Sequence, residues 1–72
     1  MANKKDILWI VGSNIRKIRL SQKMSQNQLA YEAGVTREFI NKIETGNYNI
    51  SVKNLEKIAL ILEVDIKNLF EN

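Results

Sequence analysis

Two short stretches with the hydrophobic periodicity of α-helices meet at Gly34, and each has room for only about eight helical residues. Isolated helices shorter than about 12–15 residues are marginal in water, so neither stretch can be stable alone. Leu29, Ala30 and Ala33 give the first stretch an apolar side, and the small residues at 30 and 34 let two helix axes approach at a steep angle. Val35 is expected to fill the turn. The two helices must therefore pack against each other and against the rest of the chain.

Capping residues and glycines divide the remaining sequence into further helices. A first helix is expected over about residues 6–22, with Gly12 lowering its stability by about 1 kcal/mol relative to alanine. Ser25 and Gln28 have the spacing of a capping box at the start of the second helix. The other expected helices run from Thr36 to about Glu44, from Ser51 through Leu62, and from Asp65 to Leu69 and Phe70. The apolar stripes of the first and fourth helices are Ile7, Leu8, Val11, Ile15 and Ile18, and Val52, Leu55, Ile58, Ala59 and Leu62. The chain is therefore predicted to be all-α, a compact five-helix single domain over residues 1–72.

Composition limits what such a domain can do. A chain of 72 residues buries only about 60% of its unfolded surface, so its core is marginal unless something reinforces it. The sequence has no cysteine and no histidine, which excludes a disulfide and a Cys/His zinc site and fits the reducing cytoplasm. It also lacks a glycine-rich phosphate loop, so we expect no enzyme, cofactor, metal or small-molecule ligand. The apolar run at residues 7–11 is too short for a signal peptide or a membrane span. A net charge of +3 suits an anionic partner.

The third expected helix has an apolar arc of about 100° and a polar arc opposite to it. The apolar residues are Phe39, Ile40 and Ile43, and the polar residues are Arg37, Glu38, Asn41 and Lys42. Arginine, asparagine and glutamate are side chains that read guanine, adenine and cytosine edges in the major groove of DNA. A solvated helix face would show the same periodicity. The tight helix pair favours base reading, because it holds the polar side of a short helix away from the body of the domain.

Three segments carry a resemblance to known proteins: "IRKIRLSQKMSQNQLAYEAGV", "FINKIETGN" and "LEKIALILEVDIKNLF". Over residues 11–70 the sequence resembles the Xre/Cro-type family of helix-turn-helix DNA-binding domains, to which phage repressors belong. The resemblance implies a lambda-repressor-like fold with the helix-turn-helix at the second and third helices. Within the family, "TREFINKIETGNYNIS" most resembles the controller proteins of restriction-modification systems, small dimeric regulators that time expression of the endonuclease.

The resemblance assigns DNA contacts to the second and third helices and to the loop that follows them. It makes the third helix the recognition helix, so the base-contact candidates are Arg37, Glu38, Asn41 and Lys42, with Arg37 foremost. The backbone-contact candidates are Ser25, Gln26, Thr36, Asn47, Tyr48 and Asn49. Unpaired amide groups at the start of the second helix favour an anion on physical grounds as well. The loop is less basic than in relatives, so its contacts would be neutral hydrogen bonds.

Arg19 and Glu44 lie at the edges of the apolar stripes of their helices. The family pairs these two positions in a structural salt bridge, and we prefer this interpretation to a direct contact with DNA. If the pair is partly buried, removal of one partner would destabilise the fold by several kcal/mol. A loss of binding would then report unfolding.

Several apolar residues fit no predicted stripe, namely Trp9, Ile10, Ile50, Leu60, Ile61, Ile66 and Phe70. The family usually dimerises through its C-terminal region, so we assign Ile50, Ile61, Ile66 and Phe70 to a homodimer interface and leave Trp9 to local packing. The sequence thus predicts a regulator that binds a pseudo-palindromic operator in double-stranded DNA, with RNA polymerase as a candidate further partner. The alternative is a protein-binding helical module, such as an antitoxin-like partner, because the same fold can serve without DNA.

Overall fold

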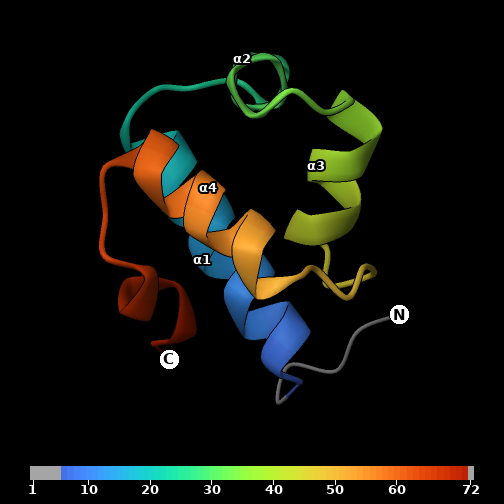
Figure 1. The fold of residues 1–72 in the computed structure, drawn as a ribbon, viewed down its shortest axis with the longest axis vertical. Coiled ribbons are helices and arrows are strands. Elements are labelled where there is room, and N and C mark those ends of the chain that lie inside the picture. Colours follow the sequence, from blue (N-terminus) through green and yellow to red (C-terminus); the bar gives the residue numbers. More distant parts are fainter. Residues whose placement is uncertain (1–5, 72) are drawn as a thin grey trace.

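The structure, a computed structural model, describes residues 6–71 and consists of helices joined by short connections (Figure 1). Its elements are α1 (Ile7–Ser21), α2 (Gln26–Ala33), α3 (Arg37–Glu44), α4 (Val52–Leu62) and η1 (Ile66–Phe70). No strand occurs among residues 6–71, so the all-α prediction is confirmed, and the fifth expected helix is a 3₁₀ turn. None of the helices in this part of the chain is long and apolar enough to cross a membrane.

Side-chain caps fix where the four α-helices begin. In each case an oxygen of the N-cap residue accepts a hydrogen bond from a backbone N–H in the first turn, which satisfies a donor that has no partner within the helix. The pairs are Asp6 with Leu8, Ser25 with Gln28, Thr36 with Phe39, and Ser51 with Asn54. The reciprocal bond of the Ser25 box, from the Ser25 backbone N–H to the Gln28 side-chain oxygen, is not made, and the Gln28 nitrogen donates to Glu32 Oε2 at 3.5 Å. Gly34 ends α2 in the left-handed conformation, with φ of 71°.

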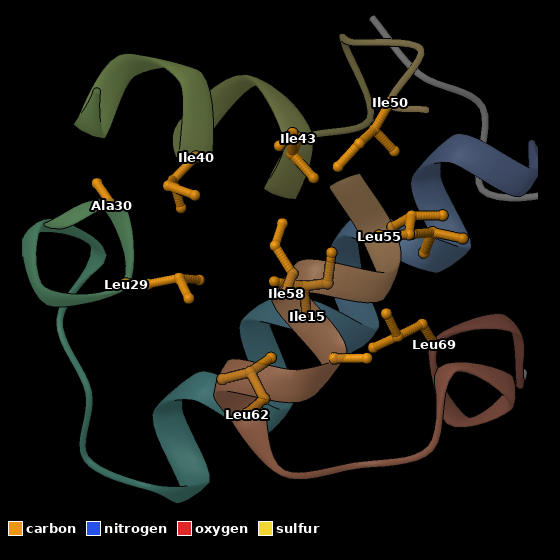
Figure 2. Packing of buried hydrophobic residues seen from close by; sticks show 12 residues of the cluster. Ile15, Leu29, Ala30, Ile40, Ile43, Ile50, Leu55, Ile58, Leu62 and Leu69 are labelled. Carbon is orange, nitrogen blue, oxygen red and sulfur yellow. The ribbon is translucent and has the colours of Figure 1, made fainter. Parts of the chain in front are cut away.

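All five elements contribute to one core (Figure 2). Its fully buried large side chains are Ile15, Leu29, Ile40, Ile43, Leu62 and Leu69. Two residues of the predicted stripes are exposed, since Ile7 is 50% and Val52 is 72% accessible to solvent. Each is the first residue of its helix, so it lies at an end of the element, away from the packed middle. The remainder of both stripes is buried or partly buried as predicted.

Gly12 brings α1 into close contact with the end of α3. A Cβ atom at this position would collide with the carbonyl oxygen of Ile43 and would lie 3.0 Å from the carbonyl oxygen of Glu44. The sequence alone showed only the helix-weakening effect of this glycine. In the structure, its missing side chain lets the backbones of α1 and α3 touch, which fixes how α3 sits on the body of the domain.

Candidate nucleic-acid interface

The helices α2 and α3 pack directly against each other and are joined by a tight turn (Figure 1). The backbone N–H of Val35 donates to the carbonyl oxygen of Ala30 at 2.9 Å, and the N–H of Gly34 donates to that of Tyr31 at 3.2 Å. Val35 itself packs against the core, as predicted. Short helices joined in this way by a glycine-containing turn form a helix-turn-helix.

The two sides of α3 have opposite environments. Ile40 and Ile43 are buried, and Phe39 is partly buried against the core and packs edge-on against the Tyr48 ring, with centroids 4.7 Å apart. The four base-contact candidates, Arg37, Glu38, Asn41 and Lys42, are all exposed. The structure therefore brings the predicted reading residues together on one open helix face. That face offers guanidinium and ammonium donors, an amide and a carboxylate to a partner.

Gln26, a predicted phosphate contact, lies against this face rather than apart from it. Its side-chain nitrogen donates to Glu44 Oε1 at 3.0 Å and to Asn41 Oδ1 at 3.3 Å. Its side-chain oxygen accepts a hydrogen bond from Arg37 Nη1 at 3.4 Å. The sequence pattern did not predict this network, although Gln26 is the first residue of α2 and a steep packing of α2 on α3 places that residue near Arg37. Gln26 therefore links the start of α2 to two candidate reading residues.

Arg19 and Glu44 form a buried, two-point ion pair. Arg19 Nε and Nη2 lie 2.7 and 3.0 Å from the two carboxylate oxygens of Glu44, and the two residues are only 4% and 5% exposed. The remaining guanidinium nitrogen, Nη1, donates to the carbonyl oxygen of Met24 at 2.7 Å. The pair joins α1, the connection to α2, and the end of α3. Its polar atoms are used within the chain and have little surface left for DNA.

The predicted backbone contacts lie at the surface around α3. Ser25 and Thr36 are exposed although their hydroxyl groups serve as helix caps. The loop after α3 exposes Asn47, Tyr48 and Asn49, and the Asn47 amide donates to Thr45 Oγ1 at 3.0 Å. These side chains flank the exposed face of α3 in sequence and carry no formal charge. They can offer hydrogen bonds to a phosphate without adding electrostatic attraction.

The predicted dimer-interface residues differ in how much surface they offer. Ile50 is 7% exposed and belongs to the core of the single chain, so our expectation that it lacks a place within the monomer is wrong. Ile61 and Ile66 are partly buried against the same core. Phe70, in η1, is 42% exposed, and Leu60, on α4, is 73% exposed. The apolar surface near the C-terminus therefore comes mainly from these last two side chains.

Comparison with known proteins gives consistent matches over most of the chain. A family model described as helix-turn-helix matches residues 15–69. The control protein C.BamHI of Bacillus amyloliquefaciens is 42% identical over 67 residues, which cover 92% of this chain and 83% of the relative. Among solved structures, the restriction-modification controller protein C.AhdI from Aeromonas hydrophila is similar with a TM-score of 0.83 and 32% identity, over 88% of this chain and 96% of the other. The biofilm regulator SinR, solved in complex with DNA, gives a TM-score of 0.78 and 31% identity over 85% and 98% of the two chains. This chain belongs to the Xre-like helix-turn-helix family.

Proposed function

We propose that this protein is a transcriptional regulator that binds a specific sequence in double-stranded DNA through α3. The observation that carries the proposal is the division of α3 into a buried apolar side and an exposed polar side. A recognition helix needs this division, because one side must fix the helix on the domain while the other enters the major groove. The DNA-bound structure of the relative SinR supports the same use of the fold. We propose no catalytic activity for this protein.

The side chains of α3 suit direct reading of base edges. In this proposal Arg37 donates to the two acceptors of a guanine, Asn41 pairs with an adenine, and Glu38 accepts from a cytosine. Lys42 adds a further donor one turn from Glu38. The Gln26 oxygen accepts a hydrogen bond from Arg37, which limits the orientations that the guanidinium samples before DNA binds.

Phosphate contacts would hold the domain in register on the duplex. We assign them to Ser25 and Gln26 at the start of α2, to Thr36 at the start of α3, and to the loop residues Asn47, Tyr48 and Asn49. The first three lie at helix N-termini, where the helix dipole and free amide groups favour an anion. These contacts position α3 but do not read sequence.

We further propose that the protein is a controller of a restriction-modification system. The similarity to C.AhdI, described as a restriction-modification controller protein, and to the control protein C.BamHI supports this. In this proposal the protein works in the cytoplasm, with RNA polymerase as a further partner. The genes beside this one test the proposal, because an adjacent methyltransferase and endonuclease would support it. An adjacent toxin gene or a prophage would instead assign the protein to another kind of regulator.

Arg37→Ala should weaken binding selectively on the preferred operator. The replacement removes a fork of donors without touching the core, and a lost base contact costs about 1–3 kcal/mol. Affinity for random duplexes should fall only slightly. The preferred site can be selected from random duplexes. Fluorescence anisotropy then measures the affinity for this site and for a scrambled site, and circular dichroism must show that the variant stays folded. A folded variant with the wild-type ratio of the two affinities would show that Arg37 does not read sequence.

Asn49→Ala provides the matched control for this experiment. Asn49 is exposed in the loop after α3, and as a phosphate contact it should affect all sequences alike. Gln26→Ala is a poor control, because Gln26 bonds directly to Arg37 and Asn41 and its loss would disturb the reading face as well.

We propose that the functional unit is a two-fold symmetric homodimer, with exposed apolar side chains near the C-terminus at its interface. Its two α3 helices should then enter successive major grooves about 34–36 Å apart on a pseudo-palindromic operator. Leu60 and Phe70, together with the partly buried Ile61 and Ile66, supply the apolar surface for this contact. Sedimentation at micromolar concentration should show a dimer. Only monomers at high micromolar concentration, both free and on operator DNA, would contradict it.

A further inference from the structure

Arg16 stands beside the candidate interface although its helix, α1, is not part of the helix-turn-helix. Its side chain is 57% exposed, and its Nη1 atom lies 4.0 Å from Glu44 Oε1. Arg16 precedes Arg19 by about one helical turn, so both side chains lie on the same side of α1. One of the two is buried and the other reaches solvent.

The charge of Arg16 is not neutralised by this contact. Glu44 carries a single negative charge, and Arg19 already binds both of its oxygens, at 2.7 and 3.0 Å, in a buried setting. The contact of Arg16 with the same carboxylate is longer, and the Arg16 side chain is largely exposed. Ion pairs of that kind contribute little to stability. The exposed guanidinium therefore presents a positive charge to whatever lies over this part of the surface.

The position of that charge relative to the DNA-facing residues follows from shared contacts. Glu44 Oε1 lies 4.0 Å from Arg16 Nη1 and 3.0 Å from Gln26 Nε2. The two nitrogen atoms are therefore no more than 7.0 Å apart, the sum of those distances. Gln26 in turn contacts Arg37 and Asn41 on α3. Arg16 thus lies at the edge of the proposed DNA-binding surface, next to the residue assigned to a phosphate.

We infer that Arg16 is a further contact to the DNA backbone, supplied by α1, and that its guanidinium binds a phosphate group next to the Gln26 contact. The inference rests on the proposed DNA-binding function and adds a residue to it. Guanidinium groups bind phosphate oxygens through two parallel N–H donors, which a glutamine amide cannot match in charge or geometry. This contact adds a positive charge to the interface, whereas the loop at residues 47–49 carries no charge.

Comparison of Arg16→Gln with Lys17→Gln tests this contact. Both changes remove one positive charge from adjacent positions on α1, so any effect of net charge alone is the same in both. Lys17 lies on the side of α1 that faces η1, where it lines a groove together with Asn68 and Glu71. Only Arg16 is close to Gln26. The measurement is the slope of log affinity against log salt concentration on operator DNA.

Arg16→Gln should make the salt dependence shallower. Each phosphate contact contributes about 0.9 to the slope, so a dimer that loses two contacts should lose about 1.8. Between 50 and 200 mM salt the wild-type affinity should then fall about twelvefold further than that of the variant. Lys17→Gln should keep the wild-type slope. Arg16→Lys should restore most of it, because the charge remains. The preference for operator over random DNA should stay unchanged in all three variants.

Each other outcome would overturn the inference in a recognisable way. The wild-type protein could show a steep slope that Arg16→Gln does not change, or that Lys17→Gln lowers by the same amount. Either result would show that Arg16 does not contact DNA, while DNA binding by the protein would still stand. Loss of helical circular dichroism in Arg16→Gln would show that Arg16 serves the Glu44 pair instead of a phosphate. A wild-type protein that binds no DNA would overturn the proposed function itself.

Discussion

Glu44→Ala should lower the free energy of unfolding by about 3–5 kcal/mol, because it leaves the buried guanidinium of Arg19 without its carboxylate. Arg19 is 4% exposed, so water cannot take the place of the lost oxygens without opening the contact between α1 and α3. Native domains have a total stability of only about 5–15 kcal/mol, so a large share of that stability would be lost. Urea denaturation followed by circular dichroism measures the change. An unchanged midpoint and slope would contradict the prediction.

Glu56→Ala is the matched control for this substitution. Glu56 is an exposed carboxylate on α4, and replacing a residue of that kind usually changes stability by less than about 0.5 kcal/mol. If Glu44→Ala fails to bind DNA, its thermal unfolding curve must be measured as well. A lost interaction with DNA is shown only if the variant is folded under the conditions of the binding assay.

Affinity for operator DNA should fall by about 10³ to 10⁵ between 50 and 200 mM salt, as expected for a dimer whose lysine and arginine side chains neutralise about six to ten phosphates. The fall arises because each neutralised phosphate releases counterions, and added salt opposes that release. Anisotropy titrations across this range give the slope directly, with a heparin-free buffer and a duplex of fixed length. A flat response would contradict DNA binding and would favour the alternative, a helical module that binds another protein.

The starts of the helices could be predicted because their signals are local. Ser25, Thr36 and Ser51 each cap a helix through a hydrogen bond to a residue three positions later, so the sequence spacing contains the whole interaction. The exposed face of α3 could be predicted for a similar reason, since the helical period alone separates Arg37 from Ile40. Both features depend on only a few neighbouring residues.

The features that could not be predicted depend on how separate helices meet. A glycine such as Gly12 lowers the stability of any helix by a similar amount. Only the close approach of α3 shows why a side chain is excluded at this position. Ile50 lies in a loop, and its burial depends on core residues contributed by several helices. Gln26 can be assigned to α2 from sequence, but its bonds to Asn41 and Arg37 require the packed pair of helices. Such contacts follow from tertiary geometry, which periodicity does not encode.

Because α3 has a buried side and an exposed side, substitutions in this helix fall into two groups, those that affect folding and those that affect the surface. Substitutions at Ile40 or Ile43 affect folding, whereas Glu38 and Lys42 lie outside the core and can vary without loss of stability. Arg37 and Asn41 share Gln26 as a hydrogen-bond partner, so changes at these two positions should be correlated with changes at position 26. Under the proposed function, gene duplicates with this architecture could diverge in target sequence while remaining folded, which would let several regulators of one ancestry bind different operators in one cell.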